Sequence, residues 1–124
     1  MHRVTRDSFW LAEVFTISRG SRTEAQVLTY HIDQGESGGR GECVPYARYG
    51  ETLDSVEAQI QAYIDSGDSE AMPAGAARNA VDCAIWDAEA KAKGKRVWEL
   101  LEHPAPAPVT SAFTLSLDTP ENMR

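Results

Sequence analysis

Arginine and tyrosine side chains gather in two segments that the sequence predicts to be loops. The segments are 17–24 and 45–52, and the side chains are Arg19, Arg22, Tyr46, Arg48 and Tyr49. A guanidinium offers a planar fork of donors that matches a carboxylate, and a tyrosine offers an apolar wall with a polar tip. Together the two loops suit a small anionic ligand, although exposed loops are also polar when they bind nothing.

The remaining reactive side chains form no recognisable catalytic pattern. The three histidines are scattered without the spacing of a metal site. The run Gly38–Gly41 precedes strand-like residues and not a helix, so it indicates a hairpin bend rather than a phosphate loop. Cys43 and Cys83 form no CxxC pair, and we expect two reduced, buried side chains, with a disulfide or a reactive thiol as the alternative. No catalytic residue and no metal ligand is therefore assigned within this chain.

The charge of the chain limits its partners. The net charge of −7 disfavours nucleic acids and anionic membrane surfaces, because both are polyanions. Residues 1–48 contain six arginines and six acidic residues, so the whole negative excess lies in residues 49–124. The N-terminus lacks the apolar stretch of a secretion signal, and no apolar run reaches the roughly 18 residues of a membrane span. We therefore expect a cytoplasmic protein with no nucleic-acid and no membrane partner.

Short stretches rich in β-branched and aromatic residues predict a three-stranded antiparallel meander. The stretches are residues 2–11, 25–33 and 39–44. In the second of them, Leu28, Tyr30 and Ile32 share one face, which is clearly apolar. The glycine-rich connection over residues 34–39 fits a tight hairpin, because such turns need backbone angles that glycine adopts at little cost.

After Gly50 the spacing of apolar residues changes to the helical period of 3.6. It predicts an amphipathic helix over residues 53–65, with Thr52 as its N-terminal cap. A short third helix is predicted over residues 97–101. A meander followed by helices is an α+β fold.

The second helix is predicted to run from Pro73, a residue favoured in the first turn, to Gly94, a natural C-terminal stop. Its small residues form a narrow stripe that lets another element approach closely. These residues are Ala77, Ala80, Ala84 and Ala88. The pairs Asp87–Lys91 and Glu89–Lys93 have the favourable i,i+4 spacing of helix-stabilising ion pairs.

The alternation of proline and alanine after His103 predicts a domain boundary, because it fits neither a helix nor an interior strand. We therefore expect one domain over residues 1–103, a stiff linker over 104–108, and the start of a further domain over 109–124. That start is predicted as a strand over 109–117 and a helix capped by Asp118 or Thr119, the opening of a β/α unit whose parallel partner strand is absent. The chain is expected to be a truncation or a partial sequence.

Four segments of the chain resemble the dipeptide epimerases of the enolase superfamily, specifically the L-Ala-D/L-Glu epimerases. The segments are 15–22, 41–52, 73–87 and 114–121. The middle two are long and particular, and the resemblance covers nearly the whole chain. The region over residues 66–72 departs from it, being shorter than the family's usual link between the helices.

The resemblance implies an N-terminal capping domain of three strands and a helical bundle, followed by a (β/α)₇β barrel. In the family the barrel holds Mg²⁺ on three carboxylates, and lysines on opposite faces remove and return the proton on the glutamate α-carbon. Those ligands are absent here, and the only lysines, at positions 91, 93 and 95, lie at a helix end. The cofactor and the catalytic groups are therefore expected in the barrel, and this chain alone is expected to be inactive.

The resemblance also assigns a substrate-binding set to the cap. Arg19 is implied as the partner of a substrate carboxylate, Arg22 and Tyr49 belong to the loops that close over the barrel mouth, and Thr114 matches a position that faces the site from the first barrel strand. The implied partners are a small dipeptide and the barrel domain of the same enzyme, with a homo-oligomer left open.

Three interpretations follow from the sequence. The first is the capping part of an L-Ala-D/L-Glu epimerase that acts in the recycling of peptidoglycan peptides. The second keeps the fold but changes the reaction to that of a muconate cycloisomerase, an N-acylamino-acid racemase or an o-succinylbenzoate synthase, since fold does not determine function. The third is a non-catalytic gene fragment.

Overall fold

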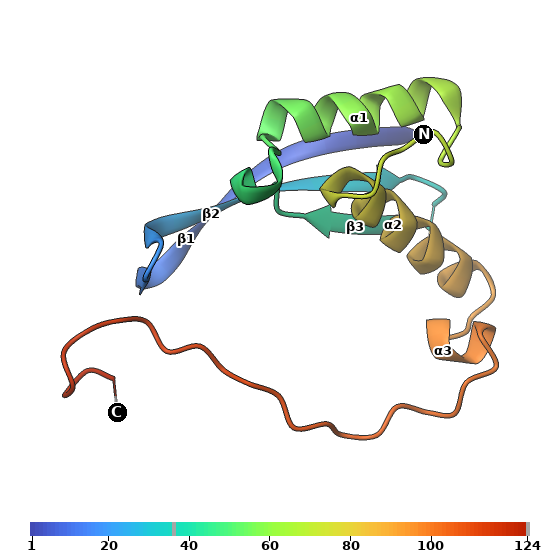
Figure 1. Ribbon diagram of the computed structural model, residues 1–124. Coiled ribbons are helices and arrows are strands. Elements are labelled where there is room, and N and C mark those ends of the chain that lie inside the picture. Colours follow the sequence, from blue (N-terminus) through green and yellow to red (C-terminus); the bar gives the residue numbers. More distant parts are fainter. Residues whose placement is uncertain (36, 124) are drawn as a thin grey trace.

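The protein is described by a computed structural model over residues 1–35 and 37–123. Glu36, in the predicted hairpin, and Arg124, in the predicted final helix, lie outside the described residues. The elements, in chain order, are β1 (His2–Ile17), β2 (Gly20–Ile32), β3 (Gly39–Cys43), η1 (Ala47–Tyr49), α1 (Leu53–Ser66), α2 (Ala76–Ala92) and α3 (Val97–Leu100). The three strands form one antiparallel sheet in the order β1-β2-β3, which confirms the predicted meander (Figure 1).

The hairpin between β1 and β2 is longer than predicted. The segment 17–24 is not a loop, because β1 continues to Ile17 and β2 begins at Gly20. Only Ser18 and Arg19 form the turn, and Gly20 follows with a φ of 133° that favours glycine. The polar side chains of this segment suggested a loop, but here they line a strand pair, and the Thr16 and Ser21 hydroxyls are hydrogen-bonded at 2.8 Å.

The core lies between the sheet and two helices that pack on the same face. Leu28 and Tyr30 from the predicted apolar face of β2 are fully buried, together with Val56 and Ile60 of α1 and Val81 of α2. This confirms the face assignment in the strand and the amphipathic character of α1. The N-terminus of α1 is also as predicted, since the Thr52 hydroxyl accepts the Ser55 N–H at 3.1 Å.

The alanine stripe of α2 lies directly against β3. A methyl group on Gly41 would lie 2.0 Å from the Ala80 carbonyl oxygen, and one on Gly39 would lie 2.1 Å from the Ala84 carbonyl oxygen. The prediction of close approach is therefore confirmed. The strand predicted over residues 39–44 is confirmed, and the bend predicted over Gly38–Gly41 therefore does not extend to Gly39 and Gly41, which lie in β3. The backbone of α2 leaves no space for a side chain at either position.

The predicted start of the second helix changes. α2 begins at Ala76 and not at Pro73, because Gly75 is extended and the Ala76 N–H is hydrogen-bonded to the Glu51 carboxylate at 2.8 Å. The short helix after Arg96 agrees with the prediction, ending at Leu100.

No helix among residues 1–35 and 37–123 is long and apolar enough to cross a membrane.

The segment predicted as a barrel strand, residues 109–117, forms no strand in the structure. Residues 103–116 have no regular secondary structure, and Val109 and Phe113 are 86% and 87% exposed. A strand needs a neighbour for its backbone groups, and within the described part of the chain no strand pairs with this segment. It runs as an extended chain back toward the far end of β1 (Figure 1), after which residues 120–123 form a turn in place of the predicted helix start.

This exposed segment leads to a prediction about solubility. A chain that ends at Pro104 should stay in solution at higher concentration, because it lacks the exposed apolar side chains between Val109 and Leu117. Its melting temperature should stay within a few degrees, because none of the described residues 104–123 belongs to the hydrophobic core. Concentration-dependent light scattering and thermal circular dichroism check both statements. A large drop in melting temperature would show that the segment stabilises the domain.

Candidate functional site

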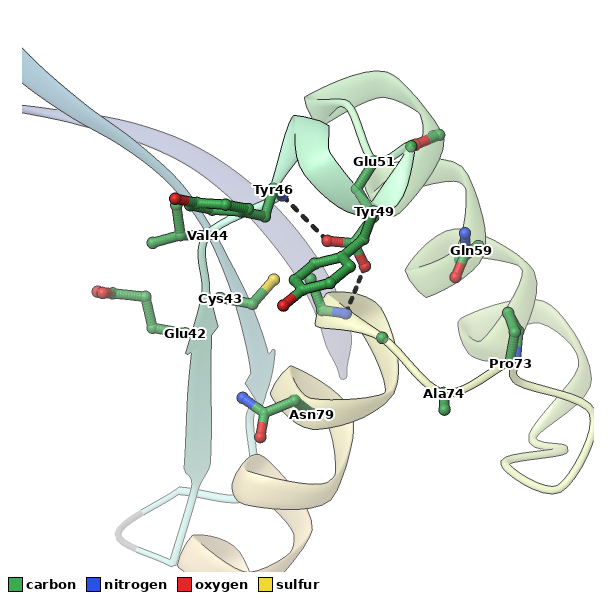
Figure 2. Close-up of a pocket in the computed structure, with 14 residues that line it drawn as sticks. Glu42, Cys43, Val44, Tyr46, Tyr49, Glu51, Gln59, Pro73, Ala74 and Asn79 are labelled. Carbon is green, nitrogen blue, oxygen red and sulfur yellow. Dashed lines mark hydrogen bonds between the residues drawn. The ribbon is translucent and has the colours of Figure 1, made fainter. Parts of the chain in front are cut away.

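A hollow of about 790 Å³ lies between the end of β3, the loop that follows it and the N-terminus of α2 (Figure 2). Its wall includes side chains from these three parts of the chain and from α1. They include Cys43, Tyr46, Tyr49, Glu51, Gln59 and Asn79. Tyr49, for which the family resemblance implies a role in substrate binding, lines this hollow, and it is 77% exposed.

Glu51 holds the walls of this hollow together. One carboxylate oxygen accepts the Tyr46 N–H at 3.0 Å and the other accepts the Ala76 N–H at 2.8 Å, as Figure 2 shows. Gly75 has no side chain to cap α2, so this carboxylate takes that place at the positive end of the helix. The sequence-based reasoning missed Glu51, although an acid placed directly before the cap of α1 was the available signal.

Cys43 lies in the wall as an inert thiol. Burial raises the pKa of Cys43 to about 11, and the nearby carboxylates of Glu51 and Glu42 add to the rise. Because the thiolate is the reactive form, this side chain stays an unreactive thiol at neutral pH. Both cysteines are free, but only Cys43 is buried, so the prediction of burial is wrong for Cys83, which lies on the outer side of α2.

The two predicted ligand-binding segments meet beside this hollow. The Arg22 guanidinium carbon lies 6.0 Å from the centre of the Tyr46 ring, and the Tyr46 and Tyr49 rings are 5.8 Å apart at 41°. Arg22 lines a second, smaller hollow of about 380 Å³, which shares Val44 and Glu51 with the first. A cation and two aromatic walls therefore stand together at the junction of β2 and the loop after β3.

Arg19 and Thr114 lie in other surroundings. Arg19 is exposed in the turn at the tip of the β1–β2 hairpin. Thr114 is exposed on the C-terminal segment, two residues before Ser116, whose hydroxyl is hydrogen-bonded to the backbone of Val14 and Thr16. The structure thus brings the segment of Thr114 next to the strand end that leads to Arg19, and it leaves both side chains open to solvent.

The described residues offer no site for a metal ion. Across residues 1–35 and 37–123, no three His, Cys, Asp or Glu side chains form a group that could hold one.

The ion pairs predicted along α2 are confirmed. Lys91 forms a salt bridge with Asp87 at 2.7 Å, and Lys93 forms one with Glu89 at 2.5 Å. Burial acts to raise the pKa of Asp87, but hydrogen bonds from Lys91 and the Arg40 N–H outweigh it and hold that pKa below its usual range. The Asp87 carboxylate joins α2 to β3, because it accepts the Arg40 N–H at 3.0 Å.

Residues 2–102 match the family described as mandelate racemase / muconate lactonizing enzyme, N-terminal domain. The chain is 37% identical over 129 residues to the L-Ala-D/L-Glu epimerase of Escherichia coli (strain K12), which covers 98% of this chain and 40% of that protein. It is 43% identical over 98 residues to the N-acetyl-D-glutamate racemase of Pseudoalteromonas sp., which covers 69% of this chain and 30% of that protein. The chain thus spans less than half the length of these relatives.

Solved structures that are similar to this chain include an enolase family member and a dipeptide epimerase. An enolase family member from Agrobacterium tumefaciens with homology to dipeptide epimerases, bound to sodium and L-Ala-L-Glu, is 46% identical with a TM-score of 0.84. That match covers 98% of this chain and 40% of the other, so it includes the C-terminal segment. A dipeptide epimerase from Methylococcus capsulatus complexed with Mg and L-Arg-D-Lys is 25% identical with a TM-score of 0.66, covering 82% of this chain and 34% of the other.

Proposed function

Because the chain belongs to the mandelate racemase / muconate lactonizing enzyme N-terminal domain family, we propose that it is the substrate-covering part of a dipeptide epimerase. The proposed reaction inverts the glutamate α-carbon of L-Ala-D/L-Glu, and its proposed setting is the recycling of peptidoglycan peptides in the cytoplasm. The observation that carries the proposal is the junction of Arg22 with Tyr46 and Tyr49, which supplies a cation and apolar walls to a small carboxylate ligand.

The division of labour follows from the chemistry of the reaction. A proton on a carbon next to a carboxylate is too weakly acidic to be removed unless the resulting enediolate is stabilised. Mg²⁺ supplies that stabilisation when it is bound, and because the described residues of this chain provide no cluster of metal ligands, we assign the metal and the proton-transferring groups to a barrel domain outside it. The chain's own residues then bind the dipeptide, orient it and exclude water.

Four residues of the chain, three in the cap and one in the C-terminal segment, are proposed to contact the dipeptide. Arg19, at the exposed hairpin tip, is the proposed partner of the glutamate side-chain carboxylate. Arg22 and Tyr49 form the side of the cover at the junction with the loop after β3. Thr114 is proposed to face the same ligand from the segment that leads into the barrel.

A second candidate reaction is the racemisation of an N-acylated glutamate. The similarity to the N-acetyl-D-glutamate racemase of Pseudoalteromonas sp. favours it, at 43% identity over 98 residues. Both candidate substrates present a glutamate carboxylate to the cap and differ in the group attached to the glutamate nitrogen. The cap suits either, because Arg19, the proposed partner of the glutamate side-chain carboxylate, would meet the same group in both substrates.

The two reactions can be separated with the product of the complete open reading frame that contains this chain. With Mg²⁺ in deuterated buffer, we expect it to exchange the glutamate α-proton of L-Ala-L-Glu at least about tenfold faster than that of N-acetyl-L-glutamate. A tenfold ratio of rates corresponds to a difference of about 1.4 kcal/mol in activation free energy. Proton nuclear magnetic resonance measures both rates. The reverse order would favour the racemase, and a reading frame that stops after codon 124 would favour the non-catalytic alternative.

The isolated 124-residue chain should show neither exchange nor tight binding of Mg²⁺. Its described residues contain no cluster of ligands for the ion, and Mg²⁺ is bound in proteins through carboxylates with near-octahedral geometry. The same nuclear magnetic resonance assay and titration calorimetry measure this on a sample shown to be folded by circular dichroism. Exchange by the isolated chain would place catalytic groups within it and contradict the proposed division of labour.

A further inference from the structure

The Ser116 hydroxyl joins the C-terminal segment to the first strand of the sheet. It accepts the Thr16 N–H at 2.9 Å and donates to the Val14 carbonyl at 3.1 Å, across 100 and 102 residues of chain. The next residue adds a third link, because the Leu117 N–H donates to the Thr16 carbonyl at 2.8 Å. Both backbone polar groups of Thr16 are thus directed at residues 116 and 117.

These links are located where the sheet has least support. Among the described residues, β3 pairs only with residues 28–32 of β2. The part of the hairpin between Asp7 and Val27, which includes its tip, therefore has two strands. Its register is also irregular between Trp10 and Phe15, where four residues of β1 face one residue of β2. An isolated two-stranded hairpin is marginally stable in water, and a bulge weakens its ladder further. This arm therefore needs an outside contact to hold its tip in place.

The contact between Ser116 and β1 lies close to two of the proposed substrate-binding residues, Arg19 and Thr114. Thr16 is three residues before Arg19, and Ser116 is two residues after Thr114. We propose that Ser116 is a positioning residue, an inference that rests on the proposed function of Arg19. Its hydroxyl fastens the tip of the β1–β2 hairpin to the segment over residues 114–117, and it thereby holds Arg19 over the substrate carboxylate.

Amide hydrogen exchange in the 124-residue chain tests the fastening directly. Ser116→Ala should speed the exchange of the Thr16 amide about 3- to 10-fold, the loss expected for one hydrogen bond between neutral groups. The amide of Thr5, in the three-stranded part of the sheet, should stay unchanged. Ser116→Thr, which keeps the hydroxyl, should restore the slow exchange. Ser111→Ala is the matched control, because within the described part of the chain the Ser111 hydroxyl is hydrogen-bonded only to the neighbouring Ala112 carbonyl, at 3.5 Å.

Kinetics of the complete open reading frame product test the effect on Arg19. Ser116→Ala should raise the KM for L-Ala-L-Glu about 3- to 10-fold with kcat changed by less than about twofold, because a contact made equally in ground and transition states affects binding alone. In an Arg19→Ala background the same change should have no further effect, since residues that act through one another are not additive.

The outcomes separate the positioning role from the proposed function. Unchanged Thr16 exchange in Ser116→Ala overturns the fastening, and an equal loss in the Arg19→Ala background overturns its action through Arg19. Faster exchange in a complete protein without epimerase activity would leave the fastening in place and reject the proposed function.

Discussion

Gly41→Ala is expected to destabilise the domain by about 3 kcal/mol, the upper end of the range for an overpacked site. The added methyl group would lie 2.0 Å from the Ala80 carbonyl oxygen and 2.9 Å from the Ala84 nitrogen. Both are backbone atoms of α2, so no rotation of a side chain can relieve the overlap, and the helix must move away from β3. For a domain of this size the melting temperature should fall by about 10 to 20 °C, measured by thermal circular dichroism.

Gly67→Ala provides the matched control for this change. Gly67 ends α1 with a φ of 72° and has open space where a methyl group would go. It should cost only about 1 kcal/mol, the strain of a left-handed backbone. If Gly41→Ala cost no more than this control, β3 and α2 would separate easily, and the close approach would not define the core.

Arg19→Ala in the complete open reading frame product should lower kcat/KM for L-Ala-L-Glu about 10- to 150-fold. A charge-assisted hydrogen bond to a carboxylate in a closed, partly desolvated site contributes roughly 1.5 to 3 kcal/mol, and the substitution removes it. The loss should depend on the ligand, being large for L-Ala-L-Glu and small for L-Ala-L-Gln, whose side chain is neutral. Steady-state epimerisation of both dipeptides measures it.

Two arginines serve as controls for this prediction. Arg22→Ala should have a smaller effect, because its 6.0 Å contact with the Tyr46 ring is an exposed cation–π interaction worth about 0.5 to 1 kcal/mol. Arg48→Ala should do less still, since Arg48 is exposed in the short helix η1. Equal losses on both dipeptides in Arg19→Ala would show that Arg19 only shapes the turn, and its role in reading the carboxylate would be withdrawn.

Interactions within a few residues of one another were predictable from the sequence. The cap of α1 depends on Thr52 and Ser55, and the ion pairs of α2 join residues one turn apart. The apolar face of β2 follows from simple alternation. The alanines of α2 predicted that another element approaches the helix closely, and that element is β3. In each case the physical cause lies in local periodicity, which the order of residues contains directly.

The candidate site was only partly predictable, because its contacts join residues that are far apart in the sequence. Composition identified the arginines and tyrosines of the two segments, and the structure brings Arg22 to Tyr46 across 24 residues of chain. The start of α2 depends on Glu51, which lies 25 residues away from Ala76, so the local preference of Pro73 for a first turn did not decide it.

The tertiary structure alone decided the course of the hairpin tip and the C-terminal segment. Polar side chains at 21–24 are compatible with a loop or a strand, and pairing with β1 selects the strand. Residues 109–117 alternate as a strand does, yet the pairing that makes a strand requires a neighbour, and the described chain supplies only the edge of β1 at Thr16. Hydrogen bonds across 100 residues depend on how the whole chain packs, which local periodicity does not encode.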